Sequence, residues 1–179
     1  MMRNTYKSVF SYIQMLGTYS KKEAEELARF FISVIKEGNV EILQKKHFLQ
    51  TRGLVLRILH NGKILHEFFR KPGEQSIGKI LIDISKQVKE LKDDFKLELH
   101  ILHDFQKTNI NKLDTSKGLY CNYVSYSAYL LPQNLEKIRY AEKLCQKASL
   151  PNDAWQRDGF ELYEFMLERF EFDVGEMNK

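Results

Sequence analysis

Apolar side chains recur every three or four residues in four segments of the chain, which is the spacing of one face of an α-helix. These segments are 20–38, 77–91, 133–149 and 160–170. The first opens with Ser20-Lys21-Lys22-Glu23, a capping box that satisfies two backbone amides at a helix start. The sequence therefore predicts four helices, of which the last, aromatic on more than one face, is expected to be mostly buried.

Strand patterns lie between the predicted helices. Residues 53–59 and 63–69 flank Asn61-Gly62, a pair that adopts the positive φ angles of a tight hairpin turn. Apolar and polar residues alternate over 95–101, which predicts a strand with one solvated face that includes Glu98 and His100. Residues 119–131, rich in tyrosine, valine and serine, hold one strand or a hairpin.

This order of elements predicts an α+β domain of two lobes. We expect a mostly antiparallel sheet with a central hairpin, flanked by about four to five helices. Residues 20–172 would form the domain, with 1–19 as an N-terminal extension and 173–179 as a C-terminal tail.

Glu67 is the residue that does not fit its predicted strand. A two-residue turn with regular pairing sets Ile58 opposite Leu65, Arg57 opposite His66 and Leu56 opposite Glu67. Both faces of this hairpin are otherwise mostly apolar, so it is expected to be central in the sheet.

Two interpretations of this carboxylate stay open. A buried carboxylate without a partner costs several kcal/mol, by order of magnitude, so Glu67 must be paired, protonated or open to a cleft. In the first interpretation it forms a salt bridge with an Arg or Lys of a neighbouring element. In the second it lines a cleft with His66 and Arg70 near it, where a raised pKa would let it serve as an acid or base.

Charge and cysteine content narrow the function classes. Lys and Arg number 28 against 24 Asp and Glu, a net charge of +4, and the basic runs are short, which does not favour a dedicated nucleic-acid binder. Cys121 and Cys145 are not in a CxxC pair, so a thiolate zinc site is not expected. We expect packed thiols and a cytoplasmic setting.

Other motifs for chemistry are weak. His100 and His103 would point to opposite faces of a strand, so they do not predict a metal site. The chain has no glycine-rich phosphate loop or dinucleotide fingerprint. No cofactor or metal is predicted.

The C-terminal part carries a family resemblance. It contains "LLPQ" at 130–133, "LCQKASLPNDAW" at 144–155 and "ELYEF" at 161–165. These segments resemble the AMMECR domain family, whose members share a Leu-Leu-Pro-Gln segment, a Leu-Cys-x-Lys-Ala-Gly-Leu segment and an Asp-Ala-Trp segment. Ser149 stands where the family usually has glycine. The resemblance covers roughly 20–170.

The hairpin departs from that family. After its turn the family usually has Leu-Arg-Gly-Cys-Ile-Gly, whereas this chain, aligned from Asn61-Gly62, has Ile-Leu-His-Glu-Phe-Phe at 64–69. Glu67 then stands at the cysteine position and Phe69 at the second glycine position. Thiol chemistry at that position does not carry over, and the resemblance implies a divergent member.

Three hypotheses for function follow. The first is a scaffold that acts through a partner, and the resemblance implies Memo-type or radical-SAM proteins as partners. The second is an enzyme that uses Glu67, His66 and Arg52. The third is an RNA-associated module in RNA modification. Ligand contacts are expected from Arg70, Lys71, Gln133 and Tyr126.

Overall fold

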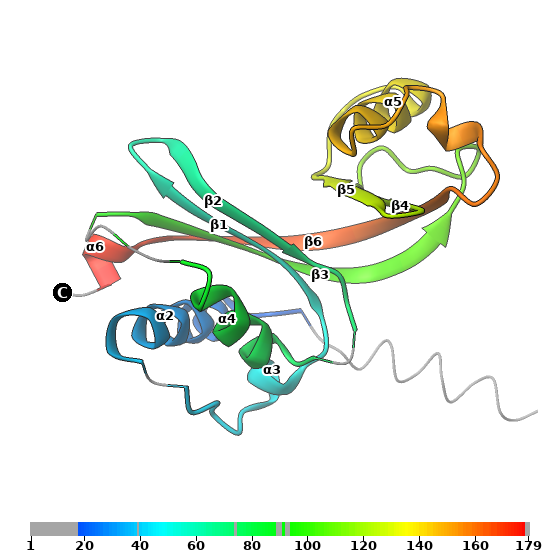
Figure 1. Ribbon diagram of the computed structural model, residues 1–179. Helices are drawn as coiled ribbons and strands as arrows, with labels where there is room; N and C mark the ends of the chain where they lie inside the picture. The colour runs from blue at the N-terminus through cyan, green and yellow to red at the C-terminus, as the bar shows by residue number, and fades with distance from the viewer. Residues whose placement is uncertain (1–17, 39, 74, 89–90, 92–93, 178–179) are drawn as a thin grey trace, which may run out of the picture.

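The computed structural model describes residues 18–38, 40–73, 75–88, 91 and 94–177 (Figure 1). Its elements, in chain order, are α2 (Lys21–Glu37), α3 (Lys46–Leu49), β1 (Gly53–His60), β2 (Lys63–Arg70), α4 (Ile77–Ser85), β3 (Lys96–Thr108), β4 (Gly118–Tyr123), β5 (Tyr126–Leu130), α5 (Lys137–Lys147), the 3-10 helix η1 (Ala154–Gln156), β6 (Glu161–Asp173) and α6 (Val174–Met177). The predicted α+β class is confirmed.

The six strands form one antiparallel sheet in the order β2-β1-β3-β6-β4-β5. Strand β1 of the hairpin is interior, as expected, whereas β2 is an edge strand. The ring of Phe69 on β2 stacks on that of Tyr129 on β5, with centroids 4.4 Å apart. The sheet therefore curls until its two edge strands approach each other.

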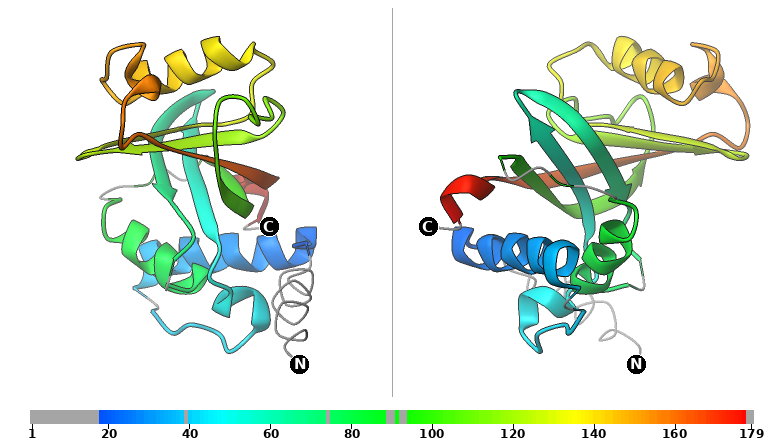
Figure 2. Two further views of the ribbon diagram at one scale, coloured as in Figure 1. Left: turned by 90° about the vertical axis from the view of Figure 1, so that its right-hand side faces the viewer. Right: turned by 60° about the vertical axis from the view of Figure 1, so that its left-hand side comes forward.

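Among the described residues, the three longest helices, α2, α4 and α5, cover the outer face of the curled sheet. Helices α2 and α4 bury Leu54, Leu56 and Ile58 of β1. Helix α5 packs on the outer residues of β4 and β5 (Figure 2). No helix among the described residues has both the length and the apolar character needed to cross a membrane.

The opposite side of the sheet, here called the inner face, holds a third apolar cluster. Its buried members are Val55, Leu102, Tyr120, Tyr129 and Phe165. Because the sheet curls around this face, it encloses some of the polar residues there as well. Glu98 and His100 of β3, expected on a solvated face, are 8 % and 2 % exposed, so that expectation is wrong.

Local signals in the first three helical segments were correct. The side chain of Ser20 accepts a hydrogen bond from the amide of Glu23, whose carboxylate accepts one from the amide of Ser20. Helix α2 ends at Gly38, which has a φ of 70°. Helices α4 and α5 form within the predicted segments and are shorter than expected.

The helix predicted for 160–170 is wrong, because these residues form most of strand β6. The strand lies between β3 and β4. Over its first part both faces are buried, because Leu162 belongs to the cluster beneath α5 and Phe165 to the inner-face cluster. A strand covered on both faces has a nearly continuous apolar run. Such a run is easily mistaken for a buried helix.

The hairpin register differs from the expectation by one residue. Asn61 and Gly62 have φ angles of 51° and 74°, as the predicted turn requires. Pairing is regular through Leu59 and Ile64, but a β-bulge then leaves Leu65 without an opposite residue. Glu67 consequently lies opposite Arg57 on the inner face instead of opposite Leu56.

Replacing Gly118 tests how closely the side chains of the inner face are packed. Gly118 lies opposite Phe165 in the sheet, and a methyl group at this position would collide with that ring. We expect Gly118→Ala to lower the free energy of unfolding by about 1–3 kcal/mol, the usual cost of overpacking a core. Denaturant unfolding measures this change. Gly73→Ala is the control, since a Cβ there meets nothing within 4 Å, and an equal loss in both variants would contradict the packing argument.

Candidate functional site

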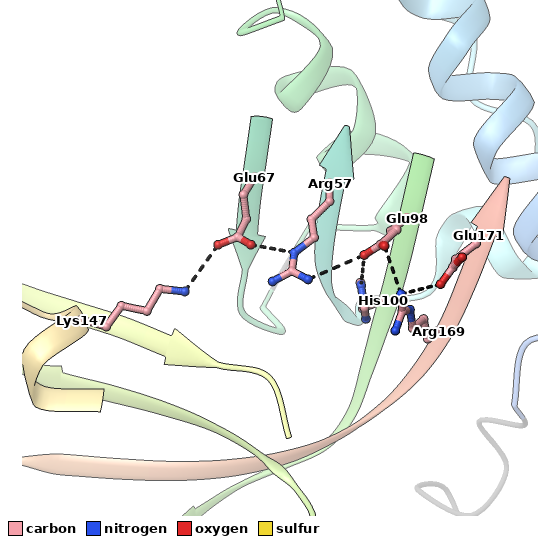
Figure 3. Close-up of polar contacts among 7 residues, drawn as sticks. All are labelled: Arg57, Glu67, Glu98, His100, Lys147, Arg169 and Glu171. Atoms are coloured by element: carbon pink, nitrogen blue, oxygen red, sulfur yellow. Dashed lines mark hydrogen bonds and ion pairs between the residues drawn. The ribbon is translucent and has the colours of Figure 1, made fainter. Parts of the chain in front are cut away.

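A row of charged residues crosses the inner face on four neighbouring strands. Glu67 on β2 is opposite Arg57 on β1, Arg57 is opposite Glu98 on β3, and Glu98 is opposite Glu171 on β6. Strand pairing alone therefore brings one cation and three carboxylates into line. Figure 3 shows this row, which we call the inner-face network, together with the side chains that complete it.

Arg57 links the first two carboxylates of the network. Its Nε donates a hydrogen bond to Oε2 of Glu67 over 2.6 Å, and its Nη1 lies 3.6 Å from Oε2 of Glu98. The second carboxylate oxygen of Glu67, Oε1, is 3.4 Å from Nζ of Lys147 at the end of α5. Glu67 thus has a cation on each side.

Arg169 supplies the third cation. Its Nη2 donates to Oε1 of Glu98 over 3.0 Å and also forms an ion pair with Glu171 on the same strand. The network therefore runs Lys147, Glu67, Arg57, Glu98, Arg169, Glu171, with alternating sign and three charges of each kind. Alternation lets every carboxylate contact at least one cation.

The pKa of Glu67 is lowered, whereas a general acid needs a raised pKa. Burial favours the protonated form, but the Tyr129 hydroxyl, Lys147 and Arg57 outweigh it and hold the pKa below its usual range. The pKa of Glu98 is also lowered: burial is opposed there by His100, Arg169 and Arg57. Both carboxylates are therefore ionised at neutral pH.

His100 is the least exposed member of the site. Its Nε2 lies 3.2 Å from Oε2 of Glu98, which assigns Nε2–H as the donor because a carboxylate only accepts. Burial is the main reason that its pKa is lowered, so the ring is neutral. Its Nδ1 is buried and has no hydrogen-bond partner within the described residues.

Lys147 connects helix α5 to the hairpin of β1 and β2. Besides its contact with Glu67, its Nζ lies 4.1 Å above the centre of the Tyr129 ring, a cation–π contact. Burial and the neighbouring Glu67 raise the pKa of the Tyr129 hydroxyl. The end of α5, the edge strand β5 and the edge strand β2 therefore meet at this point.

The structure does not assemble the three residues predicted to be catalytic. Adjacent strand residues point to opposite faces, so His66, which is opposite Ile58, lies on the outer side while Glu67 faces inward. The ring of His66 is stacked near Phe68. Arg52 precedes β1, with its guanidinium carbon 5.8 Å from the centre of the Tyr19 ring.

The predicted ligand contacts are similarly scattered. Arg70 donates a hydrogen bond to the Phe69 carbonyl, and Lys71 is exposed just beyond β2. Gln133 accepts a hydrogen bond from Lys143, and Tyr126 is 48 % exposed at the start of β5. Within the described chain, no hydrogen bond or ion pair joins any two of the four predicted residues.

Glu98, His100, Lys147 and Arg169 were missed as functional candidates. Glu98 and His100 alternate with apolar residues, a signal that also fits a solvated strand face. Arg169 lies in the segment mistaken for a helix, where its alignment with Glu98 could not be inferred. The sequence feature that pointed to this site was Glu67 itself, since a carboxylate in an apolar strand requires cations nearby.

The arrangement suits charge pairing more than catalysis. Among the residues that the structure describes, no group of three or more His, Cys, Asp or Glu side chains is placed to hold a metal ion. Cys121 and Cys145 are both buried, as expected for packed thiols, and burial raises the pKa of Cys121 to about 11. A neutral thiol of this kind is a poor nucleophile.

Comparisons with known proteins agree with this fold. The AMMECR1 family model matches residues 86–170, a segment that includes Glu98, His100, Lys147 and Arg169. At the glycine position of the family's Leu-Cys-x-Lys-Ala-Gly-Leu segment, Ser149 has a φ of 60°, a conformation that glycine adopts at no steric cost. No curated protein matches the sequence.

A solved structure, described as the crystal structure of uncharacterized protein PH0010 from Pyrococcus horikoshii, has a similar fold. The TM-score is 0.70 and the sequence identity is 19 %, with 85 % of this chain and 92 % of that chain covered. The segment that matches the AMMECR1 family model, residues 86–170, runs through β3 and most of β6.

Proposed function

We propose that this protein is a non-catalytic member of its family that acts by binding a partner protein. The observation that carries the proposal is the double ion pairing of Glu67, which contacts Arg57 at 2.6 Å and Lys147 at 3.4 Å. The one carboxylate that the sequence offered as a general acid is held in its charged form. Its role is structural, because it joins the hairpin to α5.

Catalysis by the remaining candidates has little support. A general base needs access to its substrate and a pKa near the working pH. His100 has an oriented ring and an unpartnered Nδ1, but it is 2 % exposed, so a substrate reaches it only if the curled sheet opens. His66 lies on the other side of its strand, away from Glu67.

The family resemblance names the partners to test first, which are Memo-type and radical-SAM proteins. The exposed apolar residues at the hairpin tip, Ile64 at 49 % and Leu65 at 50 %, support a surface that contacts another protein. The alternative of an RNA-associated module rests on the sequence alone, and no contact among its proposed residues supports it further.

Replacing Glu67 tests its structural role. Glu67→Gln keeps the size of the side chain but removes the charge, so the Arg57 and Lys147 cations lose their shared partner. We expect a loss of about 1–3 kcal/mol in the free energy of unfolding at pH 7. Because the folded pKa is lowered, the stabilisation exists above the unfolded pKa of about 4.3 and disappears as pH falls through the folded value.

Melting temperatures of wild type and Glu67→Gln, recorded from about pH 3 to about pH 8, measure this effect because this interval includes the titration of a glutamate. Glu176→Gln, which removes an exposed carboxylate outside the network, is the control. A Glu67→Gln protein that is more stable than wild type at neutral pH would show that Glu67 is a strained group kept for function, and the proposal would fail.

Partner binding is tested directly by calorimetric titration of the full-length protein with a purified Memo-type protein and a purified radical-SAM protein. We expect one of them to bind, and His66→Ala to leave the affinity within about twofold, since a partner surface does not require an imidazole base. Binding by neither protein would rule out these partners. If the wild-type protein showed an enzymatic activity, and His66→Ala abolished it while the protein stayed folded, the non-catalytic assignment would be overturned.

A further inference from the structure

Half of strand β6 has a free edge. Strand β4 pairs with β6 only over Glu161–Phe165. From Met166 to Asp173, β6 has β3 on one side and no strand on the other within the described part of the chain. Figure 3 shows β6 at one end of the row of four strands that carry the network, with β2 at the other end. Alternate backbone N–H and C=O groups along this edge therefore lack a strand partner.

The two terminal strands of the sheet, β2 and β5, are protected in ways that this edge is not. The bulge at Leu65 interrupts β2. Strand β5 has only five residues. Bulges and short length are devices that prevent unwanted strand pairing. The free part of β6 pairs with β3 without a bulge from Asp173 through Met166, so its outward edge is regular.

The free edge borders an open cavity of about 480 Å³ lined by Lys21, Arg169, Phe170, Glu171 and Phe172. The side chains of Arg169 and Glu171 are 53 % and 55 % exposed. These two side chains are thus accessible, and they lie on the inner face on either side of Phe170.

The sequence of the edge is complementary to itself. In an antiparallel pair of two identical strands centred on residue 170, residue 169 of one strand lies opposite residue 171 of the other. That register puts Arg169 opposite Glu171 twice, once on each side of the axis. We propose that a second copy of this chain pairs here, β6 against β6, around a twofold axis at Phe170.

Such a dimer would continue the inner-face network. A twofold axis perpendicular to the sheet keeps the two inner faces on the same side. Glu171, the last residue of the network in one copy, would then be followed by Arg169 of the second copy, so the alternation of charge would run through both molecules. This interface is independent of the partner proposed above.

Sedimentation equilibrium of the full-length protein over the nanomolar to high-micromolar range tests the proposal. We expect a monomer–dimer equilibrium that weakens with salt. Glu171→Arg places like charges opposite each other and is expected to weaken the dimer at least about tenfold. Asp158→Arg, an equal charge change on an exposed loop, is the control and should leave the dimer unchanged.

A mixture of two variants gives the sharper test. Glu171→Arg and Arg169→Glu should each self-associate poorly, but mixed together they restore opposite charges at both contacts and should form a heterodimer. Hydrogen exchange of wild-type protein should also show protection of amides in 166–173 that increases with concentration. A wild-type protein that stays monomeric, or a dimer that Glu171→Arg does not weaken, would overturn the proposal.

Discussion

Pairing of the enclosed Glu98 carboxylate is the constraint on which the arrangement of this sheet depends. The residue is 8 % exposed, so its charge must be balanced inside the curled sheet. Arg57 of β1, Arg169 of β6 and His100 of β3 all contact it. Removing either arginine leaves a buried charge with less compensation, a change that typically costs more than the intact pair contributes. Glu98 therefore fixes β1, β3 and β6 in their mutual register.

The same network ties helix α5 to the hairpin. Helix α5 packs on the outer face of β4 and β5, far along the sheet from the hairpin, yet Lys147 contacts Glu67 across the gap between the two edge strands. The stacked rings of Phe69 and Tyr129 lie beside this ion pair. Polar and aromatic contacts thus close the sheet without backbone pairing between β2 and β5.

Much of the fold could be predicted from the sequence because its strongest signals are local. The capping box of α2 and the Asn61-Gly62 turn depend on residues three or fewer positions apart, and both are confirmed. The salt bridge of Glu67 could also be anticipated, since an unpaired carboxylate does not persist in an apolar strand. Strand β6 could not, because its burial depends on β3 and β4, which are distant in sequence. The partners of Glu98 depended on that strand.

The bulge at Leu65 also bears on how this chain is compared with its relatives. A bulge acts as a one-residue insertion, and every side chain beyond it changes face. In a relative whose hairpin is regular, the fifth residue after the Asn-Gly turn lies opposite the position of Leu56, whereas here the sixth, Phe68, does so. An alignment anchored on the turn equates Glu67 with the family's cysteine in sequence. Superposition on such a regular hairpin would instead put Phe68 in the cysteine's place. Beyond Leu65, residues that align in sequence therefore no longer occupy the same position in space.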